Sequence, residues 1–143
     1  MGREKIAMTT ETKKVSGYIL LSVPTIIYGG YFLLTVLSGQ ENNLGLTYFQ
    51  ISMFRAGHAH AGVLVLLALI AQLFVDNINV SNILKWFIRI SFPVSAILIS
   101  LGFFVSAIGK DITKPTGLIF ILYFGVLLLI AGLLTLGIGL LRK

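Results

Sequence analysis

The chain has 143 residues, of which 57% are apolar and only 11% charged, and its formal net charge is +6. An average soluble domain is about 45–50% apolar and about 25% charged. This composition, with a mean hydropathy of +0.97, predicts a protein whose solvent is the lipid bilayer, because a soluble globule has nowhere to bury so much hydrocarbon. It excludes a soluble enzyme, a disordered protein and a DNA-binding module. The lack of cysteine excludes a disulfide framework, a thiolate metal site and a catalytic thiol.

Four apolar segments each reach the roughly 20 residues with which an α-helix spans the hydrocarbon core. They cover about 15–37, 47–76, 83–108 and 117–141, and the most apolar part of the second is Gly57–Val75. Segments of this length indicate helices, because the strands of a membrane barrel are short and alternate in polarity. We therefore predict an all-α fold: a polar tail over residues 1–14, then a single domain over 15–143 that forms a four-helix membrane bundle.

The distribution of Lys and Arg predicts the orientation of this bundle. Eight of the 11 basic residues fall on one side, in the N-terminal tail, in and after the second loop, and at the C-terminus: Arg3, Lys5, Lys13, Lys14, Lys85, Arg89, Arg142 and Lys143. Only Arg55, Lys110 and Lys114 fall on the other side. Since cytoplasmic loops carry the excess of basic residues, we expect a multi-pass protein of the cell membrane with both termini in the cytoplasm.

Small residues spaced by four predict where helices approach one another closely. Three such sets occur: Gly57 with Ala61, Gly102 with Ser106, and the row Ala131, Thr135 and Gly139. Because apolar helices often contain such spacings by chance, each set indicates a possible contact and identifies no partner helix.

Both histidines of the chain, His58 and His60, lie in the second predicted helix, one or two turns below the outer face. An ionisable residue inside a membrane span is costly, which makes each a candidate functional residue. Successive helix residues are about 100° apart, so these two side chains point roughly 200° apart and cannot hold one small ion together. Either one histidine is a ligand, or each faces a different partner.

Arg55, His58 and Gly62 are spaced by three and four residues and share one face of the predicted helix. That face suits a flat, anionic macrocycle: the imidazole of His58 on a haem iron, the guanidinium of Arg55 on a propionate, and Gly62 leaving space for the ring. His60 faces the other way, towards the Phe49 side or a neighbouring helix. It is a second ligand, a hydrogen-bond partner or a polar bridge between helices.

Other interpretations of the same residues stay open. The histidines can simply hydrogen-bond between packed helices, and Arg55 can extend to the outer headgroups; the chain is then a non-catalytic accessory or structural subunit. A third possibility is a transporter of a metal ion or proton, with copper as the alternative metal if Met8 or Met53 joins the histidines. Asp76 and Asp111 are not predicted to be buried enough for a proton path.

The segment from Arg55 to about Leu66 resembles helix two of subunit one of the haem–copper oxidases and nitric oxide reductases. The resemblance depends on the Arg55-x-x-His58 spacing, the small residues around it and the expected inward direction of the helix. It implies that His58 is an axial ligand of a low-spin, b-type haem, with a role in electron transfer, haem sensing or haem handling. The family has twelve helices in three arcs of four, so this chain resembles one arc.

The chain departs from that family in a way that limits its chemistry. The family's second axial histidine, its copper ligands and its cross-linked tyrosine lie on later helices, whereas this chain has no histidine after His60. One copy is therefore not expected to be a complete enzyme. A sixth iron ligand would come from His60 of another copy, from Met53, from a second His58, or be absent. We accordingly predict a homo-oligomer, with a trimer preferred over a dimer.

Overall fold

The computed structural model describes residues 8–39 and 44–142, and this part of the chain forms four long helices. These are α1 (Thr10–Leu37), α2 (Tyr48–Val75), α3 (Asn82–Val105) and α4 (Phe120–Leu141), and the short 3-10 helix η2 (Gly117–Ile119) leads into α4. Within the described residues, all four helices are long and apolar enough to cross a membrane. The predicted all-α class is confirmed, and the four candidate spans support a multi-pass membrane protein.

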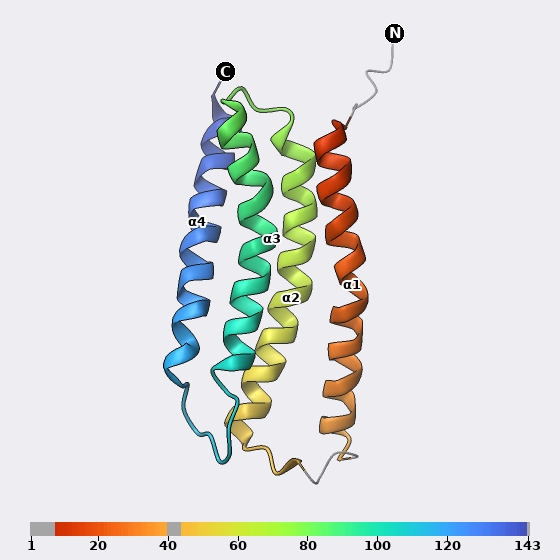
Figure 1. Cartoon of the computed structure of the whole chain (residues 1–143), viewed down its shortest axis with the longest axis vertical. Coiled ribbons are helices and arrows are strands. Elements are labelled where there is room, and N and C mark those ends of the chain that lie inside the picture. Colours follow the sequence, from red (N-terminus) through yellow and green to blue (C-terminus); the bar gives the residue numbers. More distant parts are fainter. Residues whose placement is uncertain (1–7, 40–43, 143) are drawn as a thin grey trace.

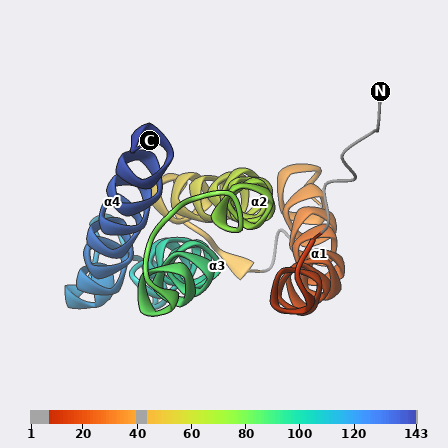
Figure 2. The same ribbon diagram turned by 90° about the horizontal axis from the view of Figure 1, so that it is seen from above.

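The helices run alternately up and down, so the start of α1 and the end of α4 lie at the same end of the molecule (Figure 1). Seen from above, α2 and α3 form the middle of the bundle, with α1 at one edge and α4 at the other (Figure 2). The most extensive contacts are those of α3 with α2 and with α4, whereas α1 packs mainly on α2 and barely touches α3. Among residues 8–39 and 44–142, one side of α1 is therefore left without a protein neighbour.

The first helix begins at Thr10, before the predicted apolar segment, so residues 10–14 of the polar tail are helical. Thr9 is the N-cap, and its side chain accepts a hydrogen bond of 3.2 Å from the backbone N–H of Thr12. Thr9 and Thr12 also donate their hydroxyls to Asp76 at the end of α2, over 3.0 and 2.7 Å. Hydropathy alone does not include these polar residues in the apolar segment. Their hydroxyls are nevertheless satisfied at the start of α1, by the N-cap contact and by Asp76.

Asp76, at the end of α2, belongs to a largely buried polar cluster, whereas the sequence did not predict it to be buried. Its carboxylate forms an ion pair with Arg89 of α3, and the exposed fractions of the two side chains are 16% and 4%. Arg89 also donates to the hydroxyls of Thr9 and Thr12, each over 3.3 Å. The cluster joins the start of α1, the end of α2 and the first turns of α3, and so fixes α1 at this end of the bundle.

Glycines set the close approach of α3 and α4. A Cβ added at Gly102 would lie 2.5 Å from the backbone nitrogen of Leu122, and one at Gly125 would lie 2.9 Å from side-chain atoms of α3. The buried row on α4 contains Gly125, Gly132 and Gly139, at a spacing of seven. Of the predicted row Ala131, Thr135 and Gly139, only Gly139 is buried between helices of one copy, and Ala131 is exposed.

Candidate functional site

The start of α2 is fixed firmly, and this sets the depth of both histidines. Thr47 and Gln50 form a capping box, and the Gln50 amide donates to the carbonyls of Ala107 and Gly109, each over 2.9 Å. With a rise of 1.5 Å per residue, His58 lies about 15 Å along the helix from Tyr48. The histidines therefore lie near the middle of α2.

His58 is half-buried and lies against the backbone of α1. A Cβ added at Gly30 would lie 3.0 Å from its Cε1 and 3.1 Å from its Nε2, and one at Gly29 would lie 3.7 Å from Nδ1. The glycine pair thus forms a bare strip of backbone that admits the imidazole between the two helices.

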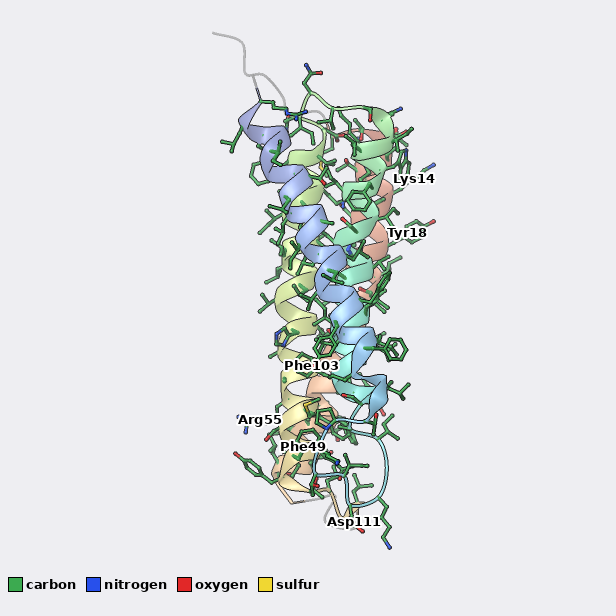
Figure 3. The ribbon with its side chains drawn as sticks, turned by 90° about the vertical axis from the view of Figure 1, so that its left-hand side faces the viewer. Lys14, Tyr18, Phe49, Arg55, Phe103 and Asp111 are labelled. Carbon is green, nitrogen blue, oxygen red and sulfur yellow. The ribbon has the colours of Figure 1, made fainter. Side chains whose placement is uncertain are left out.

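An apolar groove of about 320 Å³ opens beside this imidazole, between α1 and α2. It is lined by Gly30, Leu33, Leu34, Leu37, Arg55 and His58. The exposed Arg55 side chain points away from α2 near the end of the bundle opposite the termini (Figure 3). Arg55 forms no ion pair with any residue in the described ranges. The groove therefore combines the imidazole of His58, the guanidinium of Arg55 and an otherwise apolar wall.

Gly62 does not line this groove, although the helical spacing placed it on the same face. A Cβ added there would meet no atom within 4 Å. The structure thus brings together Arg55 and His58 of the three predicted residues and leaves Gly62 beside open space, one turn further along α2.

His60 is exposed and lies against a different helix from His58, as their spacing predicts. Its ring packs on Phe103 of α3, with the ring centroids 4.8 Å apart. Its Nδ1 lies 2.8 Å from the Ala56 carbonyl. Because a carbonyl only accepts, Nδ1 donates its hydrogen in this contact, and in the neutral ring Nε2 then carries the lone pair. Metal-binding histidines are usually oriented by a hydrogen bond of this kind.

The two histidines do not form one cluster. Over residues 8–39 and 44–142, no group of three His, Asp or Glu side chains is placed to hold a metal ion. Sequence reasoning missed Gly29, Gly30 and Phe103, the residues that determine where the two rings lie. A signal was present for the glycines, because two adjacent glycines inside an apolar helix indicate a close approach by another group. No signal paired Phe103 with His60.

No family model, no curated protein and no solved structure matches this chain. The resemblance of the Arg55–Leu66 segment to the oxidase helix therefore stays a prediction that depends only on the residues of this segment.

Proposed function

We propose that the chain is a small haem-binding integral membrane protein whose role is electron transfer, haem sensing or haem handling. The observation that carries the proposal is that His58 and Arg55 line the same apolar groove. An imidazole supplies an axial ligand and a guanidinium pairs with a propionate carboxylate. A bound haem would supply a one-electron redox centre.

The residues of the groove fit one side of a haem. Leu33, Leu34 and Leu37 offer an apolar wall, and Gly30 leaves the imidazole in place without a competing side chain. The volume of about 320 Å³ is near the lower end of the ~300–1,000 Å³ of small-molecule sites. The groove therefore covers part of a macrocycle, and the rest needs a second protein surface or lipid.

A second axial donor is proposed to come from another copy of the chain. The Nε2 atom of the exposed His60 can donate its lone pair to an iron, because the Nδ1–H group donates to the Ala56 carbonyl. One copy cannot direct His58 and His60 to the same iron, since they lie against different helices. A head-to-tail contact that joins the His58 groove of one copy to His60 of the next forms a ring when the rotation between copies closes. A trimer is preferred because three four-helix copies would match the three arcs of the oxidase family that the segment resembles, with a dimer or a Met53 ligand as alternatives.

We further propose that the protein lies in the cell membrane with both termini in the cytoplasm. The eight basic residues on the side of the termini, against three on the other, support this orientation. The common end at which α1 starts and α4 ends agrees with it (Figure 1).

Absorption spectroscopy tests the haem proposal. The full-length protein, purified in mild detergent from haem-replete cells, is expected to show a Soret band and, after reduction, α and β bands. If it is colourless, hemin is added and the titration followed at the Soret band. A protein that is colourless as purified and takes up no hemin would overturn the proposal.

The second candidate is a non-catalytic accessory subunit in which the histidines only pack helices. It is favoured by the direct contact of His58 with the α1 backbone and of His60 with Phe103. In that case, replacing both histidines leaves every spectral property unchanged and lowers only the stability of the bundle.

A further inference from the structure

The two halves of α1 are held in the bundle very differently. The first half, residues 10–23, contributes Val15 and Ile19 to the larger hydrophobic cluster of the bundle, and Thr12 donates its hydroxyl to Asp76. The second half, residues 25–37, contributes no residue to either hydrophobic cluster of the described ranges. Leu33 is its only buried residue. The first half is therefore anchored, and the second half is held more weakly.

The second half of α1 also exposes most of its surface. Four of its large apolar side chains are 62–73% exposed, namely Ile27, Tyr28, Tyr31 and Leu34. Its contact with His58 of α2 is made by bare backbone, at Gly29 and Gly30. Few side chains therefore hold this half of the helix against α2.

Pro24 separates the two halves and interrupts the hydrogen bonding of α1. Because proline has no backbone N–H, the Leu20 carbonyl lacks its helical donor. No side-chain hydrogen bond within the described residues ends on this carbonyl. The nearby hydroxyls of Ser22 and Thr25 each donate to a carbonyl three residues earlier, over 2.7 and 2.6 Å. Hydroxyls that return to their own helix in this way often bend it.

The other proline inside a helix has a different environment. Pro93 of α3 frees the Arg89 carbonyl in the same way, but Gln72 of α2 donates to that carbonyl over 3.1 Å. Among the described residues, no neighbouring helix supplies such a donor at Pro24. Since helices bend sharply at prolines, α1 is expected to bend most easily at Pro24.

We propose that the second half of α1 is a gate, hinged at Pro24, that swings away from α2 and widens the groove beside His58. The role of this gate in admitting a haem rests on the proposed function. Four of the six residues that line the groove belong to this half: Gly30, Leu33, Leu34 and Leu37. Because Arg55 and His58 belong to α2, movement of the gate enlarges the groove and leaves the two polar groups in place.

Distances between pairs of spin labels test the gate without haem. The chain has no cysteine, so two cysteines are introduced into the full-length protein and labelled. The gate pair is Tyr31→Cys with Val63→Cys, and the anchor pair is Lys14→Cys with Leu73→Cys. Each pair joins α1 to α2 through exposed positions. In the hemin-free protein, double electron–electron resonance is expected to give two distances for the gate pair and one for the anchor pair.

Two proline variants locate the hinge. Pro24→Ala restores the missing N–H, and is expected to lower the population of the longer gate-pair distance about fivefold, the effect of one hydrogen bond. Pro93→Ala in α3 is the matched control and should leave the gate pair unchanged. Added hemin is expected to shift the gate pair of the wild-type sequence towards the longer distance.

Either of two results in the hemin-free protein would overturn the gate. These are a single distance for the gate pair, and an unchanged population of the longer distance in Pro24→Ala. If hemin binds and the gate-pair distances stay the same, the gate has no role at the haem. If hemin does not bind, the proposed function fails, whereas two distances in the hemin-free gate pair still support the hinge.

Discussion

Gln72 of α2 donates its side-chain amide to the backbone carbonyl of Arg89 in α3, over 3.1 Å. This is the carbonyl that Pro93, four residues later, leaves without its helical donor, because proline has no backbone N–H. Both side chains, Gln72 and Arg89, are buried. A side chain of the neighbouring helix thus supplies the donor that Pro93 lacks, near the end of α2 and the start of α3, and couples these two helices.

Replacing Gln72 by Leu is expected to destabilise the protein by about 1–3 kcal/mol, because it leaves a buried carbonyl unpaired. Pro93→Ala restores the helical N–H, so the double variant should recover most of the loss. Thermal unfolding in detergent measures all four proteins of this double-mutant cycle. If Pro93→Ala brings no recovery, the hydrogen bond does not have this role.

The ion pair of Asp76 with Arg89 predicts a loss of stability in acid. Burial raises the pKa of Asp76, but hydrogen bonds from Thr12 and Thr9 and the charge of Arg89 outweigh it, and the pKa is lowered from 3.8. Because the pKa is lower in the folded state than in the unfolded state, the carboxylate stabilises the fold above about pH 4. This contribution is lost as the pH falls through the folded pKa.

The unfolding temperature of the wild-type protein should fall as the pH is lowered from 7 to 3. In Asp76→Asn the unfolding temperature should depend less on pH. The variant is also expected to lose about 3 kcal/mol at pH 7, because it leaves the buried Arg89 charge without its partner. Asp111→Asn, on an exposed loop, is the control. If the stability of Asp76→Asn falls towards pH 3 as steeply as that of the wild type, other carboxyl groups cause the loss of stability in acid.

Gly30→Ala tests whether the position of the His58 ring matters for the proposed site. The added Cβ would lie 3.0 Å from the imidazole, whereas at Gly17 of the same helix it would meet nothing within 4 Å. Displacing a ligand ring typically costs 10–100-fold in affinity. We therefore expect hemin to bind Gly30→Ala at least about tenfold more weakly, and Gly17→Ala as the wild type does. If Gly30→Ala and the wild type bind hemin with equal affinity, the Gly29–Gly30 pair is not part of the haem site.

The proposed orientation is open to a direct test, because the chain has no cysteine. Single-cysteine variants at Asn79 and Thr113, both exposed in loops at opposite ends, are treated in intact cells with a membrane-impermeant maleimide. Thr113→Cys should be labelled from outside, and Asn79→Cys only after permeabilisation. The reverse pattern would invert the topology.

The four helices could be predicted from sequence because each is a continuous apolar run of sufficient length. The start of α1 could not, since the hydroxyls of Thr9 and Thr12 donate to Asp76, a residue far away in the chain. The glycine row of α4 was missed for a related reason. In a helix that is apolar all round, spacing identifies small residues but not the side that faces α3.

At the candidate site, the helical period placed His58 and His60 against different helices, and placed Arg55 beside His58. It also placed Gly62 in that set, which the groove does not include. The tilt of α1 against α2 decides this, and no pattern within α2 contains it. The same holds for Gly30 and Phe103, which belong to other helices.

The central claim is that the imidazole of His58 is a haem ligand, and chemical rescue tests it most directly. The absorption spectrum of hemin-loaded His58→Gly is recorded with and without added imidazole and compared with the wild type. We predict that the variant alone has a weakened and shifted Soret band, and that imidazole restores the wild-type spectrum by filling the space that His58 leaves. A spectrum of His58→Gly identical to that of the wild type without imidazole would contradict the claim.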